Sequence, residues 1–135
     1  MTRVFLDTGY VIALESRDDQ HHEVATTHWR QFAPEITSIV TTTCVVGELL
    51  TFFNNRNQHA KAVEIGQRIM SSSLTELVHV DEALFDAGWR YFQRHSDKRY
   101  SLTDCVSFLV MDQLDIQYAL AFDRHFLQAG YHRLP

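Results

Sequence analysis

Short apolar runs alternate with amphipathic stretches along the chain, and this pattern predicts strands separated by helices. Four runs have the length and the apolar or β-branched composition of strands, at 2–6, 36–41, 75–80 and 118–122. A fifth, shorter edge strand is predicted at 131–134, after Gly130. Because apolar strands that alternate with helices form parallel sheets with both faces covered, we expect an α/β fold: three α/β/α layers with a small, mostly parallel sheet.

Helical periodicity fills the segments between these strands. Asp81 is placed to cap one helix, and Ser101 and Asp104 have the spacing of a capping box at the start of another. The predicted helices span 10–15, 21–32, 44–54, 59–71, 82–95 and 102–114. The third and fourth follow each other through a short polar turn, so we expect them to form a helical hairpin.

The composition indicates one globular domain, residues 1–135. Hydrophobic residues make up 45% of the chain and charged residues 21%, which is enough for a core and unlike a disordered segment. No apolar run has the length of a membrane helix, and the first residues lack the pattern of a signal peptide. Cys44 and Cys105 stand alone, without the spacing of a zinc–thiolate site. We therefore expect a reduced, cytoplasmic protein that is not associated with a membrane.

The charge balance argues against binding nucleic acid by overall charge. The chain has 12 basic and 17 acidic residues and a formal charge of −5. Residues 90–100 differ from the rest of the chain, because they include four basic residues, one acid and three aromatic residues. The formal charge of this segment is +3, so the formal charge of the remaining residues is −8. This segment either holds a nucleic-acid strand or is a solvated helix end whose cations favour the helix dipole.

Four carboxylates interrupt apolar sequence: Asp7, Glu48, Asp104 and Asp123. Asp7 and Asp123 each follow a predicted strand, so both should lie at the edge where ligands of parallel sheets bind. Taken singly, these two could end a strand or cap a helix, and Asp104 could be only the acid of its capping box. Glu48 is harder to explain, because it lies in the middle of an apolar helix with no cation one turn away.

Convergence of the four acids would favour a divalent metal. Clustered carboxylates repel and raise one another's pKa, and a bound cation removes that conflict. Carboxylate oxygens suit Mg²⁺ or Mn²⁺, which activate water and stabilise charge on a phosphodiester. The histidines show no metal-binding spacing, and we expect most of them at the surface.

The acids lie in four motifs that occur together in one family. The motifs are L-D-T at 6–8, V-V-G-E-L at 45–49, S-L-T-D-C at 101–105 and F-D-R-H-F at 122–126. In this order and spacing the chain resembles, over essentially its whole length, the PIN-domain nucleases, above all the VapC-type toxins of bacterial toxin–antitoxin pairs. The resemblance implies a PIN-like fold and Mg²⁺- or Mn²⁺-dependent cleavage of RNA at Asp7, Glu48, Asp104 and Asp123. By this analogy, Asp7 and Asp104 are the main metal ligands.

The resemblance also implies supporting residues and partners. Beside the acids, we expect four residues to bind substrate or support the carboxylates: Thr8, Thr103, Arg99 and Arg124. It suggests a homodimer and an antitoxin protein whose basic side chain blocks the acidic site. The hairpin at 44–71 would form the dimer face or the antitoxin groove, with Phe52 and Phe53 either exposed there or part of the core. Gly9 and Ala121 depart from the family pattern, since many relatives have a hydroxyl residue at these places.

Two other function classes could account for acids at these positions. Phosphoaspartate receivers and phosphatases also place acids at strand ends. The chain lacks the lysine that a receiver needs after a late strand, however, and the D-x-D pattern of the phosphatases. The other alternative is a catalytically weak PIN-like module that binds RNA or protein. Substitution of Asp7 or Asp104 distinguishes it from a nuclease, because only a nuclease would lose an activity.

Overall fold

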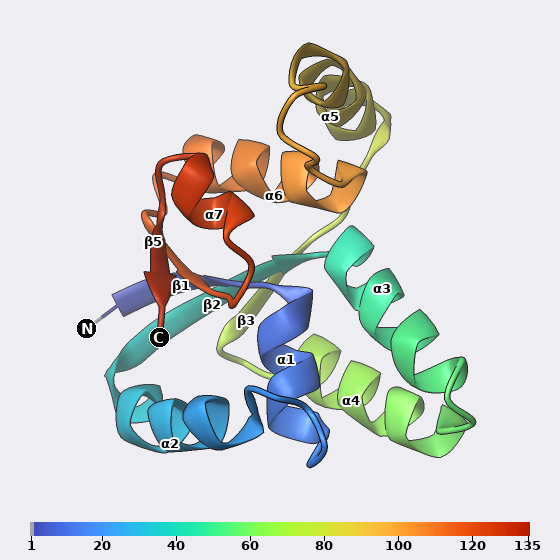
Figure 1. Cartoon of the computed structure of the whole chain (residues 1–135), viewed down its shortest axis with the longest axis vertical. Coiled ribbons are helices and arrows are strands. Elements are labelled where there is room, and N and C mark those ends of the chain that lie inside the picture. The colour runs from blue at the N-terminus through green and yellow to red at the C-terminus, as the bar shows by residue number, and fades with distance from the viewer. Residues whose placement is uncertain (1) are drawn as a thin grey trace.

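A sheet of five parallel strands forms the centre of the computed structural model, which describes residues 2–135 (Figure 1). The strands are β1 (Thr2–Leu6), β2 (Ile36–Thr42), β3 (Thr75–Val78), β4 (Tyr118–Leu120) and β5 (His132–Leu134). Their order is β3-β2-β1-β4-β5, and every neighbouring pair is parallel. The expected mostly parallel sheet is thus confirmed, with no antiparallel strand among the described residues.

Helices cover both faces of the sheet, as expected for a three-layer fold. They are α1 (Thr8–Glu15), α2 (His22–Phe32), α3 (Thr43–Asn54), α4 (His59–Ser71), α5 (Glu82–Arg94), α6 (Leu102–Gln113) and α7 (His125–Gln128). Figure 1 shows α1, α2 and α4 on one side of the sheet and α6 and α7 on the other, with α5 projecting beyond α6. Helix α3 leads on from β2 and pairs with α4, so the predicted hairpin is confirmed.

The helix starts follow the capping residues in the sequence. The Thr42 hydroxyl accepts a hydrogen bond from the Val45 N–H at 3.2 Å, and the Asp81 carboxylate accepts one from Leu84 at 2.8 Å. Ser101 and Asp104 form a reciprocal capping box, with both bonds at 3.0 Å. Such caps satisfy backbone donors that the first helical turn leaves free, which is why these boundaries were predictable.

Several element boundaries differ from the expectation. The strand predicted at 75–80 ends at Val78, and the helix predicted from residue 10 begins at Thr8. Strand β4 ends at Leu120 rather than at 122, because its pairing partner in β1, Leu6, is the last residue of that strand. Helix α7 and a 3₁₀ turn at Ala33–Glu35 were not predicted. Segments of three or four residues are too short to show helical periodicity.

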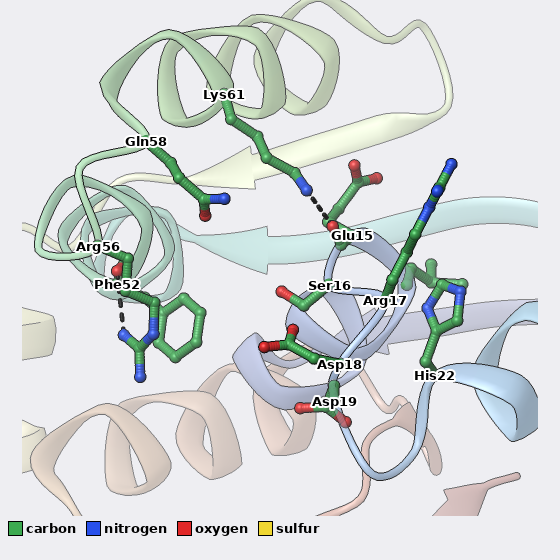
Figure 2. A pocket seen from close by; sticks show the side chains of 11 residues that line it. Glu15, Ser16, Arg17, Asp18, Asp19, His22, Phe52, Arg56, Gln58 and Lys61 are labelled. Atoms are coloured by element: carbon green, nitrogen blue, oxygen red, sulfur yellow. Dashed lines mark hydrogen bonds between the residues drawn. The ribbon is translucent and has the colours of Figure 1, made fainter.

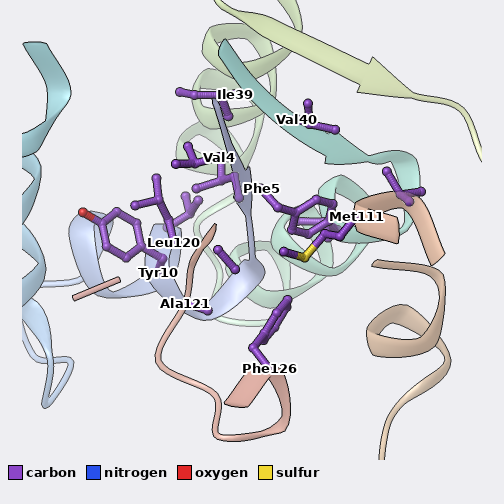
Figure 3. Close-up of a cluster of buried hydrophobic side chains, with 14 of the residues drawn as sticks. Val4, Phe5, Tyr10, Ile39, Val40, Met111, Leu120, Ala121 and Phe126 are labelled. Carbon is purple, nitrogen blue, oxygen red and sulfur yellow. The ribbon is translucent and has the colours of Figure 1, made fainter. Parts of the chain in front are cut away.

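The core lies on both faces of the central strands. Val4 and Phe5 are consecutive in β1 and fully buried, which requires cover on both sides because successive side chains point to opposite faces. Figure 3 shows Tyr10 of α1 on one side of these strands, and Met111 and Phe126 on the other. This double cover holds the strand ends, and the residues that follow them, in a rigid frame.

The aromatic pair on α3 belongs to the core more than to a surface. Phe53 is fully buried, and Phe52 is half-buried with the Arg56 guanidinium 3.5 Å above its ring. Phe53 was expected either at an exposed interface or in the core, and the second expectation is correct. Among residues 2–135, no helix is both long and apolar enough to cross a lipid bilayer.

Candidate functional site

The strand order places two of the four acids side by side. The chain leaves β1 toward β2 and β3 on one side, whereas β4 and β5 lie on the other, so β1 and β4 border the point where the direction of winding changes. Ligands of open parallel sheets bind at this point, beyond the carboxyl ends of the strands. Asp7 directly follows β1, and its N–H donates to the Leu120 carbonyl at 3.1 Å. Asp123 comes three residues after β4.

Asp104 reaches the same edge from the first turn of α6. Its side chain is only 9% exposed, and its Oδ2 accepts the Ser101 N–H at 3.0 Å and lies 2.9 Å from His125 Nδ1. Burying a carboxylate costs several kcal/mol unless it is hydrogen-bonded, paired or coordinated. The capping box therefore explains part of its stability but does not explain why Asp7, also buried, lies near it.

Glu48 approaches the edge from α3. Its carboxylate accepts a hydrogen bond from the Thr8 hydroxyl at 2.9 Å, which links α3 to the start of α1. The expectation of an acid within an apolar seam is wrong, because Glu48 is exposed while Val45 and Leu49 carry the buried face of the helix. Thr8 thus contacts one of the four acids, and its supporting role at the site stays a prediction.

His125 completes a compact group that the sequence did not reveal. Within residues 2–135, the ligand atoms of Asp104, Asp123 and His125 lie within 4.8 Å of one another. His125 Nδ1 is 3.2 Å from Asp123 Oδ1, and its backbone N–H donates to the same oxygen at 2.8 Å. The expectation of surface histidines fails here, since this side chain is 24% exposed. The only signal was its place two residues after Asp123, inside the F-D-R-H-F motif.

The charges of three carboxylates act on the fourth, Asp7, and we call Asp7, Glu48, Asp104 and Asp123 together the acidic edge. Burial raises the pKa of Asp7 to about 7, and the charges of Asp104, Asp123 and Glu48 contribute in the same direction. Burial also raises the pKa of Asp104, although hydrogen bonds from Ser101 and His125 partly oppose the rise. Because negative charge on these carboxylates is unfavourable in the free protein, a bound cation would stabilise their ionised forms.

The donor set suits a divalent cation. Carboxylate oxygens are the ligands that Mg²⁺ and Mn²⁺ prefer, and one imidazole is compatible with Mn²⁺. The compact group holds Asp104 and Asp123, whereas Asp7 and Glu48 lie close enough to act through their charges. The choice of Asp7 and Asp104 as the main ligands therefore stays a prediction.

The remaining residues expected at the site lie around it. Thr103 precedes Asp104 and is half-buried, and its carbonyl accepts the Ser107 hydroxyl at 2.8 Å. Arg99 and Arg124 are both exposed, each within five residues of one of the acids in sequence. Their roles in binding substrate stay predictions.

None of the four acids lines the cavity between α1 and the α3–α4 hairpin. Figure 2 shows it between the end of α1 and the turn from α3 to α4, with a volume of about 730 Å³. Two of its cations donate to backbone carbonyls, Lys61 to that of Glu15 and Arg56 to that of Phe52. A shallower cleft of about 520 Å³ is lined by Thr8 and by one of the four acids, Glu48.

Known proteins share both the sequence pattern and the fold. A family model described as PIN domain matches residues 4–130. The chain is 34% identical, over 95% of both chains, to the 23S rRNA-specific endonuclease VapC20 of two Mycobacterium tuberculosis strains, CDC 1551 / Oshkosh and ATCC 25618 / H37Rv. The crystal structure of M. tuberculosis VapC20, described as a sarcin-ricin loop cleaving toxin, superposes with a TM-score of 0.84, again over 95% of each chain.

A more distant structure shares the fold alone. FitAcB from Neisseria gonorrhoeae is 16% identical and superposes with a TM-score of 0.66, covering 98% of this chain and 96% of the other. At this identity the similarity extends to the arrangement of sheet and helices and carries no information on substrate.

Proposed function

The chain belongs to the PIN-domain family, and on this premise we propose that it is an endoribonuclease dependent on Mg²⁺ or Mn²⁺. The observation that carries the proposal is the burial of Asp7 beside other acids: burial, and to a lesser extent the charges of Asp104, Asp123 and Glu48, raise its pKa to about 7. Burial of two carboxylates beside two more is unfavourable for the fold alone and favourable for holding a divalent ion.

The four acids would serve as the ligands of the metal ion. Asp7 and Asp104 would be the main ligands, with Asp123 and Glu48 completing the set directly or through water. A divalent ion bound there would supply Lewis-acid activation of a water and would neutralise charge on the phosphodiester.

Two neighbours would orient these carboxylates. The Thr8 hydroxyl donates to Glu48, and His125 bridges Asp104 and Asp123. The His125 ring is itself held by the edge of Tyr100, with the ring centroids 5.3 Å apart. Contacts of this kind fix the geometry of metal ligands and are commonly needed for full affinity.

The relatives suggest the RNA to test first. M. tuberculosis VapC20 is named for 23S rRNA and for cleavage of the sarcin-ricin loop, and the present chain matches it over 95% of its length. We propose that a structured ribosomal RNA loop is the substrate class. RNA nucleases of this kind read loops by shape and by unpaired bases rather than by duplex sequence.

A cleavage assay tests the proposal. Purified protein is incubated with a sarcin-ricin hairpin and with an unrelated hairpin, in Mn²⁺, Mg²⁺ or EDTA. We expect cleavage that requires the metal and that falls at least about a hundredfold in Asp104→Asn, which keeps the shape but not the charge. Glu35→Gln, an exposed acid far from the edge in sequence, is the matched control and should cleave normally. Metal-independent cleavage, or full activity of Asp104→Asn, would refute the proposal.

We also propose a homodimer and an antitoxin protein as the physiological partners. A basic side chain from such a partner would enter the acidic edge and compensate the repelling carboxylates. Co-expression with the neighbouring reading frame, followed by size-exclusion chromatography, tests both points. A monomer that elutes alone under all conditions would contradict them.

A further inference from the structure

Helix α5 carries an aromatic stripe that the fold does not use. Phe85, Trp89 and Phe92 are 48%, 49% and 41% exposed and follow one another at helical spacing. The neighbouring stripe packs α5 onto α6, where Gly88 lies so close that a Cβ there would be 2.7 Å from Val106. Because that second stripe already joins α5 to α6, the exposed parts of Phe85, Trp89 and Phe92 are not needed for this packing.

Beside this stripe lies a pocket of about 350 Å³. The indole of Trp89 and the ring of Phe92 line it and lie nearly parallel, 6.0 Å apart and at 17°. Arg99 and the buried Tyr100 also contribute to the lining, with Gln93 and Ser96 as hydrogen-bonding groups. A flat aromatic group with polar edges would find stacking surfaces and hydrogen-bond partners here.

The charge around the pocket is opposite to that of the rest of the molecule. Residues 90–100 hold a formal +3 in a chain whose remainder holds −8. All four basic residues of this segment are exposed: Arg90, Arg94, Lys98 and Arg99. Within the described part of the chain, only Lys98 has an acidic partner, Asp97 at 3.8 Å. The segment beside the pocket thus carries a local positive charge that would attract an anion.

The pocket adjoins the acidic edge. Tyr100 lines it, and the same ring lies edge-on to His125, 5.3 Å away. His125 in turn contacts Asp104 at 2.9 Å. The His125 side chain therefore lies between Tyr100, a wall of the pocket, and the Asp104 carboxylate.

We propose that this pocket binds an unpaired base of the RNA substrate, stacked on Trp89, while Arg99 contacts a neighbouring phosphate. The substrate class rests on the proposed function. Stacking on exposed aromatic side chains beside cations is how proteins hold single-stranded nucleic acid. A second copy of the chain is a poorer occupant, because symmetric pairing would bring two positively charged segments together.

The test measures RNA binding without cleavage. Full-length protein in EDTA is titrated with a labelled single-stranded oligoribonucleotide and with a duplex of the same sequence, at several salt concentrations. The single strand should bind more tightly than the duplex. Trp89→Ala should weaken single-strand binding about tenfold, the effect of one lost stack, whereas Trp89→Phe retains a ring and most of the affinity. Arg99→Gln should reduce the slope of log affinity against log salt by about 0.7, one phosphate contact.

Phe85→Ala is the matched control. Phe85 belongs to the same stripe with almost the same exposure as Trp89, but it lies outside the pocket, so RNA affinity should not change. An equal loss in Phe85→Ala and Trp89→Ala would mean that the whole stripe is a docking face and would overturn the base pocket. Unchanged RNA affinity in Trp89→Ala would also overturn it, as would a dimer that this substitution dissociates without affecting RNA.

A fluorescence signal checks the stack directly. The chain has two tryptophans, so Trp29→Phe leaves Trp89 as the only indole, and its emission should be quenched by the oligoribonucleotide. Absence of quenching in a complex that forms would contradict stacking. Because binding needs no turnover, Trp89-dependent binding without any cleavage would refute the proposed function alone. Cleavage with Trp89-independent binding would refute the base pocket alone.

Discussion

Asp7 shows how a single side chain can oppose the stability of the fold that contains it. It is buried, and its pKa is raised to about 7 by burial and by three other carboxylates. Hydrogen bonding lowers this cost only in part, through the backbone N–H of Thr8. A residue kept at such a cost is expected to serve a ligand rather than the fold.

The pH dependence of stability should report this residue. The folded state keeps a proton on Asp7 up to about pH 7, whereas the unfolded chain releases it near the ordinary value of 3.8. Metal-free stability should therefore fall as the pH rises from about 4 to about 7, by up to a few kcal/mol, since one pKa unit corresponds to about 1.4 kcal/mol. Urea unfolding in EDTA across this range measures the slope.

Asp7→Asn should remove that part of the slope. The variant should be at least as stable as the wild-type protein at pH 8 without metal, because it has no charge to bury. A clear loss of stability at pH 8 would mean that Asp7 is a structural acid, and the metal account of the edge would fail at this residue.

Gly9 offers a second test at the same scale. A Cβ at this position would lie 4.0 Å from Asp7 Oδ2, so a serine hydroxyl could donate to that oxygen. Gly9→Ser is expected to bind Mn²⁺ severalfold to about tenfold more tightly than Gly9→Ala, by favouring the charged carboxylate. Both variants gain helix propensity, so their difference in calorimetric titration isolates the hydroxyl. Equal affinities would show that the hydroxyl does not reach Asp7.

At the scale of elements, the sequence predicted what local chemistry decides. The predicted caps at Asp81 and Ser101 set the starts of two helices and form the expected hydrogen bonds, and Thr42 caps a third helix. Strand β4 was predicted too long, because its end depends on where β1 stops and not on its own residues. Capping residues near a helix start determine where that helix begins, whereas the neighbouring strand in the sheet determines how far a strand continues.

Two glycines in different helices should respond oppositely to alanine. Gly88→Ala would place a methyl 2.7 Å from the stiff Val106 side chain, and overpacking of this kind should exceed the gain in helix propensity. We expect a net destabilisation of about 1 kcal/mol. Gly47→Ala on α3 meets nothing within 4 Å and should stabilise the protein by up to about 1 kcal/mol. Chemical denaturation of both variants checks the signs; stabilisation by Gly88→Ala would mean that α5 and α6 pack less closely.

For the molecule as a whole, topology explains which parts of the site were predictable. Asp7 and Asp123 could be placed at one edge because both follow parallel strands, and the order β2-β1-β4 makes them neighbours. The part played by His125 could not be predicted, since it depends on a four-residue helix that turns the ring back toward Asp104. The exposure of Glu48 was missed for a similar reason, because its partner Thr8 is 40 residues away in sequence.

The central claim is that the convergent carboxylates form a divalent-metal site. Thermal melting of the wild-type protein and of Asp104→Asn, with and without Mn²⁺, tests it most directly, because an ion that binds only the folded state raises the melting temperature with its occupancy. The account predicts a rise for the wild-type protein at millimolar Mn²⁺ and little or none for Asp104→Asn. No rise in the wild-type protein, or the same rise in both, would contradict a metal site built on Asp104.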